Sequence, residues 1–221
     1  MFKRLIVLFV CITLAIPVLS QKTSKYEDLK YEYNAALDLF KKQKYGPAQK
    51  HFQKVIEVSG ITKSDMRMES EYYRAICAIE LFNKDAEYLI GNFIEQYPES
   101  QRVMTAYFQM GKYQFRKKKY RKATEWFGQV ELSQLTREEQ AEYYFKMGYS
   151  YFILEDYTKA NKMFYEIKDI DTRYTVPAIY YYSHIEYLNE NYQTALEGFE
   201  RLSDNPMFSP IIPYYKTQIF Y

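Results

Sequence analysis

The side chains that could carry out chemistry are few and lie far apart in this sequence. The two histidines, His51 and His184, fall in opposite halves of the chain. The sequence contains no His-Glu-x-x-His metal motif, no Gly-x-Ser-x-Gly nucleophile turn and no glycine-rich phosphate loop. The acidic neighbours Glu138 and Glu139 fit the first turn of a helix, where the helix dipole favours negative charge. We therefore predict no catalytic residue, no metal site and no cofactor, and expect a protein that is not an enzyme.

A run of positive side chains is the strongest local charge signal. From Lys112 to Lys122 the sequence holds seven Lys or Arg residues and no acid. Its densest part, which we call the basic turn, consists of Arg116, Lys117, Lys118, Lys119 and Arg121. Two interpretations are open. The run is either a solvated turn between two helices or a patch for an acidic partner or anionic lipid headgroups.

The overall composition argues against a nucleic-acid-binding protein. Lys and Arg number 30 against 28 Asp and Glu, and two of these cations, Lys3 and Arg4, lie in an apparent targeting segment. Without that segment the chain is formally neutral, whereas nucleic-acid-binding proteins usually carry a basic footprint. Aromatic residues make up 19% of the sequence, while Gly and Pro number only 7 each. This composition favours a packed helical domain over a disordered or all-β chain.

The first twenty residues have the features of a secretory signal peptide. Two positive residues precede an apolar run, Leu5–Leu19, and Ser20 provides a small residue before a cleavage point at Gln21. The run is short for a membrane span, which takes about 20 residues, although an uncleaved anchor is the alternative. We expect residues 1–20 to be removed and residues 21–221 to be exported to the periplasm or cell envelope.

The two cysteines are expected to have no chemical role. Cys11 lies inside the apolar run and lacks the small preceding residue that lipoprotein signals normally have. Cys77 then remains as a single thiol, which cannot form an internal disulfide. Its apolar neighbours predict a small buried residue in the core.

The rest of the sequence repeats a short pattern, Tyr-x-x-Ala-x-x-x-Phe. Four copies begin at Tyr45, Tyr120, Tyr157 and Tyr192, and a weaker copy surrounds Ala86. The alanines of these copies are 35 to 38 residues apart, and each follows a small residue by eleven or twelve positions. These small residues are Ala36, Ala75, Gly111, Gly148 and Ser183.

The spacing predicts pairs of helices. Ala and Phe four residues apart lie on one face of a helix, and a small residue on a second helix allows the two to approach closely. One such hairpin cannot bury its own apolar face, so the copies must stack. We expect capping boxes at Ser24 and Thr136, and a helix start at Ser209-Pro210.

The pattern of a small residue, then Tyr, Ala, Phe and a closing Pro, resembles the tetratricopeptide repeat (TPR) family, whose units are two antiparallel helices in about 34 residues. The resemblance implies an all-α fold: a right-handed α-solenoid of antiparallel helix hairpins, with five repeats plus the first helix of a sixth. The segment Asn92–Ser100 is similar to repeat ends of periplasmic TPR proteins, including the lipoprotein of the outer-membrane β-barrel assembly machinery. The expected repeats are at about residues 25–60, 64–98, 101–134, 137–172 and 175–207, with an incomplete one at 210–221.

The first helix of each repeat, here called helix A, carries a ladder of aromatic residues. In the TPR family the ligand-facing positions lie on this helix, on the concave side. Three positions before each small residue stand Tyr33, Tyr72, Phe108, Phe145 and Tyr180; four positions after it stand Phe115, Phe152 and Tyr187 in the later repeats. Lys112, Tyr149 and His184 lie between these two rows. The rings either pack against the neighbouring helix A or form a groove for a partner.

We therefore expect a protein-protein interaction scaffold that binds a protein or peptide in an aromatic groove. Two alternatives stay open. One is a component of envelope assembly that handles outer-membrane proteins or glycans, and the other is the repeat region of a longer enzyme. Because the last repeat stops inside its helix A, we also expect further repeats beyond residue 221.

The targeting segment generates a direct prediction. Mass spectrometry of the exported protein is expected to find an N-terminus at or near Gln21, because Ser20 is the small residue that precedes the cleavage point. An intact Met1 in a membrane fraction would contradict cleavage and favour the anchor.

Overall fold

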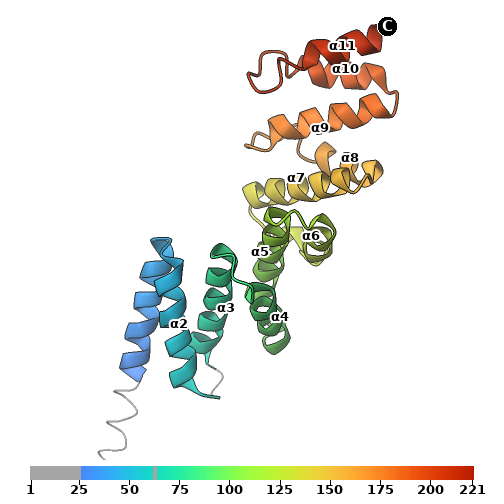
Figure 1. Cartoon of the computed structure of the whole chain (residues 1–221). Coiled ribbons are helices and arrows are strands. Elements are labelled where there is room, and N and C mark those ends of the chain that lie inside the picture. The colour runs from blue at the N-terminus through green and yellow to red at the C-terminus, as the bar shows by residue number, and fades with distance from the viewer. Residues whose placement is uncertain (1–25, 62–63) are drawn as a thin grey trace, which may run out of the picture. The chain divides into compact units, whose positions relative to one another are not determined.

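A computed structural model describes residues 26–61 and 64–221, and these residues form an all-α fold (Figure 1). The predicted signal peptide, residues 1–20, lies outside the described residues, as does the capping box at Ser24. Among the described residues, no helix is both long enough and apolar enough to cross a membrane. The helices are residues 26–41, α2 (Tyr45–Ser59), α3 (Asp65–Glu80), α4 (Ala86–Gln96), α5 (Arg102–Arg116), α6 (Tyr120–Phe127), the 3-10 helix η1 (Leu132–Gln134), α7 (Arg137–Ile153), α8 (Tyr157–Tyr165), α9 (Thr175–Leu188), α10 (Tyr192–Glu200) and α11 (Ile212–Phe220).

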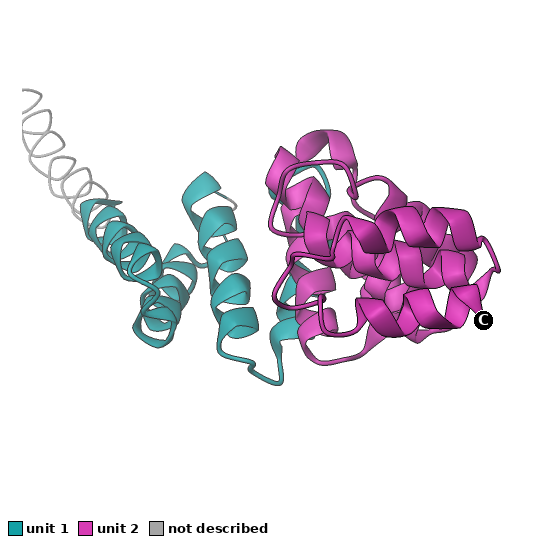
Figure 2. Cartoon of the chain, turned by 90° about the horizontal axis from the view of Figure 1, so that it is seen from above, with its two compact units in different colours: residues 1–102 teal, residues 103–221 magenta. Residues whose placement is uncertain are grey.

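The chain divides into two compact units (Figure 2). Unit 1 ends at Arg102 and contains the helix of residues 26–41 with α2, α3 and α4. Unit 2, Val103–Tyr221, contains nearly all of α5 and every helix that follows. Within each unit, consecutive helices form antiparallel hairpins that stack on one another, as predicted for a TPR-like solenoid.

The α5–α6 and α7–α8 hairpins are closed by the contact that the spacing predicts. Ala123, Phe127, Ala160 and Phe164 of the second helices are fully buried. A Cβ atom added at Gly111 would lie 2.5 Å from the Phe127 ring, and one added at Gly148 would lie 3.0 Å from the Phe164 ring. The small residue therefore provides the space that the phenylalanine ring of the partner helix fills.

A second aromatic contact joins one hairpin to the next. Phe164 of α8 stacks on Tyr181 of α9, with ring centroids 5.3 Å apart and an interplanar angle of 16°. Phe199 of α10 stacks on Tyr215 of α11 at 4.4 Å and 16°. Unit 1 repeats the arrangement with Phe52 and Tyr73 at 5.4 Å and 14°. Each repeated phenylalanine thus packs against both its own hairpin and the following one.

The turns inside the hairpins share one backbone geometry. After α7, the N–H of Glu155 donates to the carbonyl of Phe152, and the N–H of Asp156 donates to that of Tyr151. This is the Schellman pattern, in which one residue adopts the left-handed conformation, usually as glycine. Here that residue is never glycine: Gln43, Phe82, Lys118, Glu155 and Glu190 have φ between 56° and 61°.

One predicted helix start is confirmed and another is wrong. At α7, Thr136 and Glu139 form the predicted capping box. Ser209 and Pro210, however, do not begin α11, which starts at Ile212. The residues before it form a series of turns, in which the Ser209 N–H donates to the Asn205 carbonyl at 2.8 Å.

The close contacts predict opposite effects for two glycine substitutions. Gly111→Ala places a methyl group against the buried Phe127 ring, and such overpacking costs about 1–3 kcal/mol of unfolding free energy. Gly91→Ala, on α4, meets nothing within 4 Å and gains helix propensity of about 1 kcal/mol. Thermal unfolding followed by circular dichroism is expected to show a lowered Tm for the first variant and an unchanged or raised Tm for the second. Equal shifts would contradict the proposed hairpin contact.

Candidate functional site

Two of the side chains that could carry out chemistry, His51 and Cys77, take part in structural contacts. His51 Nδ1 lies 2.7 Å from Glu32 Oε2, and Cys77 is fully buried in α3. Burial raises the pKa of the Cys77 thiol to about 12, so this thiol stays protonated at neutral pH. In residues 26–61 and 64–221, no three His, Cys, Asp or Glu side chains are grouped to hold a metal ion.

Seven of the predicted groove residues come together on the A helices of unit 2. They are half-buried, belong to α5, α7 and α9, and are here called the aromatic surface: Phe115, Phe145, Tyr149, Phe152, Tyr180, His184 and Tyr187. Because each ring is partly packed and partly exposed, it is held in place while still offering a face or edge for contact.

Ring contacts connect these residues from helix to helix. Phe115 of α5 lies 5.6 Å from Tyr149 of α7, and Phe152 of α7 lies 5.7 Å from His184 of α9, measured between ring centroids. Tyr181 joins the two groups, since its ring is 5.3 Å from Tyr149 and 5.1 Å from Phe152. The rings therefore form one continuous surface over three consecutive A helices.

The remaining predicted groove residues do not lie on this surface. Tyr72 is 4% exposed and Phe108 is fully buried, so their rings belong to the core and the expectation that they line a groove is corrected. Phe108 packs on Phe127 with the centroids 6.0 Å apart. Tyr33 is half-buried in unit 1, where it meets Phe52 edge to face.

Three tyrosines that the sequence reasoning missed support the surface. Tyr120 at the start of α6 contacts both Phe115 and Tyr149, and Tyr174 stacks on Phe145 at 5.4 Å. Burial, followed by the neighbouring Tyr149, raises the pKa of Tyr181 to about 12. Tyr73 and Tyr181 both stand two positions before the small residue of their repeats, and this recurrence was the signal that could have found Tyr181.

A small charged cluster lies at the α5 end of the aromatic surface. The ammonium groups of Lys112 and Lys146 each lie 3.4 Å from an oxygen of Glu142. Lys146 Nζ also lies 4.6 Å from the centre of the Phe115 ring, a cation–π contact. Burial lowers the pKa of Lys146, while Glu142 acts in the opposite direction. We call these residues the lysine cluster; Glu142 and Lys146, four residues apart on one helix, are a pairing that sequence reasoning missed.

The basic turn lies beside this cluster, between α5 and α6. Arg116, Lys117, Lys118, Lys119 and Arg121 are all exposed. Lys117 Nζ lies 4.8 Å from the centre of the Tyr113 ring, and Lys118 is the left-handed residue of the turn. The position agrees with the predicted solvated turn between two helices.

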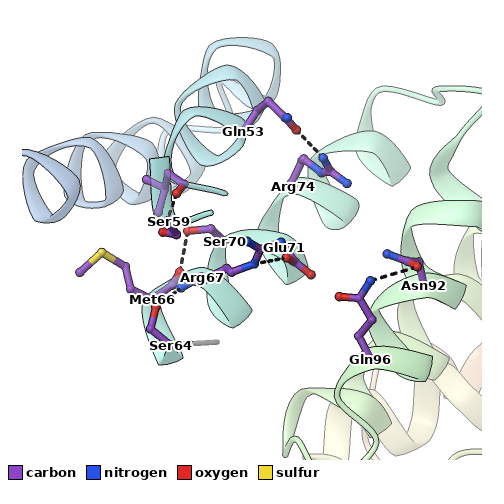
Figure 3. Close-up of polar contacts among 11 residues, drawn as sticks. Gln53, Ser59, Ser64, Met66, Arg67, Ser70, Glu71, Arg74, Asn92 and Gln96 are labelled. Atoms are coloured by element: carbon purple, nitrogen blue, oxygen red, sulfur yellow. Dashed lines mark hydrogen bonds and ion pairs between the residues drawn. The ribbon is translucent and has the colours of Figure 1, made fainter. Parts of the chain in front are cut away.

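Unit 1 holds a hollow of about 430 Å³, lined by residues that include Tyr26, Val58 and Met66. Polar side chains in this region form hydrogen bonds within α3 and between α2 and α3, where Arg74 donates to Gln53 (Figure 3). The Ser64 hydroxyl accepts the Arg67 backbone N–H at 3.2 Å, and the Arg67 Nε donates to Glu71 at 2.8 Å. These contacts explain the start of α3.

His184 generates a prediction about pH. Its Nδ1 lies 2.8 Å from the Tyr215 hydroxyl, and burial lowers the pKa of its imidazole below the usual value near 6.5. The unfolded chain therefore takes up the proton first as the pH falls, so the contribution of neutral His184 to stability is present above about pH 6.5 and is lost below it. Lowering the pH from 7 to 5 is expected to reduce the Tm of the natural chain more than that of the His184→Gln variant, as measured by thermal unfolding. Parallel curves for the two proteins would contradict this role.

Comparisons with known proteins relate the fold to solved structures. No protein-family model and no curated protein matches the sequence. NprR, in a crystal structure with its cognate peptide NprX, is similar with a TM-score of 0.50 and 13% identity, over 86% of this chain and 60% of NprR. A thermophilic TPR protein from Thermus thermophilus has a TM-score of 0.45 and 14% identity, over 87% of this chain and 100% of its own. This chain thus spans 60% of the length of NprR. With its repeated hairpins, it has an all-α, TPR-like solenoid fold.

Proposed function

We propose that this chain is a non-enzymatic scaffold that binds an extended protein or peptide segment on its aromatic surface. The observation that carries the proposal is the continuous set of half-buried rings on α5, α7 and α9. Aromatic side chains supply most of the binding energy in many protein interfaces, because they bury a large area at a low entropic cost. Tyrosine adds a hydroxyl that can bond to the backbone of the bound segment.

Two further points support a polypeptide ligand. The aromatic surface runs over three successive A helices, α5, α7 and α9, so an extended chain can contact more of it than a compact small molecule can. NprR shares the fold, and its crystal structure contains a cognate peptide. This likeness supports the proposal by analogy of fold. Because one fold can host many functions, the aromatic surface itself carries the proposal.

Export is part of the same proposal. A signal peptide over residues 1–20 would deliver residues 21–221 to the periplasm or cell envelope, where the partner would be an envelope or exported polypeptide.

The proposal predicts a loss of binding when a ring is removed from the aromatic surface. Peptides are selected from a random library on the immobilised full chain, and their affinities are measured for matched variants. Phe152→Ala is expected to cost roughly 2 kcal/mol of binding, about thirty-fold in Kd. Tyr165→Ala, which removes a ring 58% exposed on α8, is the matched control and is expected to leave Kd unchanged.

Circular dichroism and Tm values for both variants show whether the fold is intact. Equal affinities for Phe152→Ala and Tyr165→Ala, with both proteins folded, would contradict binding on the aromatic surface. A library that yields no binding peptide would contradict the proposal as a whole.

A further inference from the structure

The aromatic surface is bordered by three turns whose charges differ in sign. In each hairpin of unit 2, the left-handed residue follows a ring of the surface by three positions: Lys118 follows Phe115, Glu155 follows Phe152, and Glu190 follows Tyr187. All three turns have the same Schellman hydrogen bonds, so these side chains leave the backbone in equivalent directions. Because stacked hairpins align their turns along one edge, this edge is positive at its first turn and negative at the next two.

The positive end continues inward from the turn. Lys118, Lys119 and Arg121 are exposed and make no ion pair within the part of the chain that the structure describes. Behind them, the lysine cluster holds two cations against one carboxylate, with Lys112 26% exposed and Lys146 15% exposed. The α5 end of the aromatic surface therefore has an excess of positive charge.

The negative end has a different set of neighbours. Glu155 and Glu190 are exposed at their turns. Glu186 of α9 is buried and accepts hydrogen bonds from the side-chain amides of Asn161 on α8 and of Asn191, so it belongs to the contact between α8 and α9 and is not part of the aromatic surface. Its Oε2 lies 2.7 Å from Asn191 Nδ2. The α7–α8 and α9–α10 turns beside the surface therefore each carry an exposed carboxylate, and neither Glu155 nor Glu190 forms an ion pair with another described residue.

We infer that the bound segment carries charge in the opposite order. Its acidic side chains lie beside the basic turn and the lysine cluster, its apolar or aromatic side chains pack on the rings, and basic or neutral side chains lie beside Glu155 and Glu190. This inference rests on the proposed function and adds the chemistry and the orientation of the partner. Complementary charge selects the correct register of a ligand, because like charges placed together are repelled.

An anionic membrane fits these observations less well than an acidic polypeptide. A bilayer surface would reach the basic turn but also the negative turns at Glu155 and Glu190, which repel anionic headgroups. Lys112 and Lys146 lie among half-buried rings, where a single extended chain can place a carboxylate and a flat surface cannot.

A charge-swapped variant tests the inference without changing the net charge. It combines Lys118→Glu and Lys119→Glu with Glu155→Lys and Glu190→Lys, four exposed positions outside the ring contacts. Random peptides of one length are selected on the full natural chain and on the swapped chain, with circular dichroism as the check on folding. We expect peptides selected on the natural chain to hold their acidic residues at one end, and the swapped chain to select the reverse order. Each peptide is expected to bind its own protein roughly ten-fold more tightly than the other.

The outcomes separate this inference from the proposed function. If both chains select the same charge order, or peptides with no charge order, the inference is overturned while peptide binding stands. If neither chain selects any peptide, both are overturned. Phosphatidylcholine vesicles with and without phosphatidylserine form the membrane arm. Binding that requires phosphatidylserine and is lost in Lys118→Glu/Lys119→Glu would assign the basic turn to a membrane and overturn the inference.

Discussion

The structure depends on the contact between a small residue on helix A and a phenylalanine on the helix that follows, as in the α5–α6 and α7–α8 hairpins. At Gly111 and Gly148 the ring of Phe127 or Phe164 occupies the space that any larger side chain would need. This contact sets the distance and the rotation of the two helices, since a ring wedged against the backbone leaves little freedom to roll. The residue after each small position, such as Tyr149 or His184, is turned toward the aromatic surface as a consequence.

The same phenylalanines link stability to the candidate binding surface. Phe164 packs against Gly148 within its hairpin and stacks on Tyr181 of the next one. Tyr181 in turn supports Tyr149 and Phe152 of the aromatic surface. A surface of partly exposed rings is costly to keep ordered unless the scaffold beneath it is rigid, and this chain of contacts provides that rigidity.

The sequence predicts the fold well because its signals are local and periodic. The Ala and Phe positions follow from spacing, the burial of Cys77 from its apolar neighbours and the capping box from Thr136 and Glu139, and the structure confirms all three. The turns were harder to predict because no glycine marks the left-handed residue, as at Glu155. The predicted start of α11 at Ser209-Pro210 was wrong, because a Ser-Pro pair is common in turns as well as at helix starts.

The candidate site could be predicted only in part. Phe108 and Phe145 occupy the same position of their repeats, yet the first is fully buried and the second is half-buried. Both rings lie 6.0 Å from the phenylalanine of their own second helix, Phe127 or Phe164. They differ in their other partners: Phe108 has Lys112 over its ring, whereas Phe145 stacks on Tyr149 and on Tyr174 of a connecting segment. Such partners depend on contacts between helices, which a repeat pattern does not specify.

The most direct measurement is an aromatic carbon–proton NMR titration. The full chain, with its Phe and Tyr rings labelled, is titrated with a peptide that it binds. If the peptide binds on the aromatic surface, the signals of Phe115, Tyr149 and Phe152 shift together and saturate at one peptide concentration, while that of Tyr165 stays in place. Shifts at Tyr165, with the signals of the aromatic surface unchanged, would contradict binding on that surface.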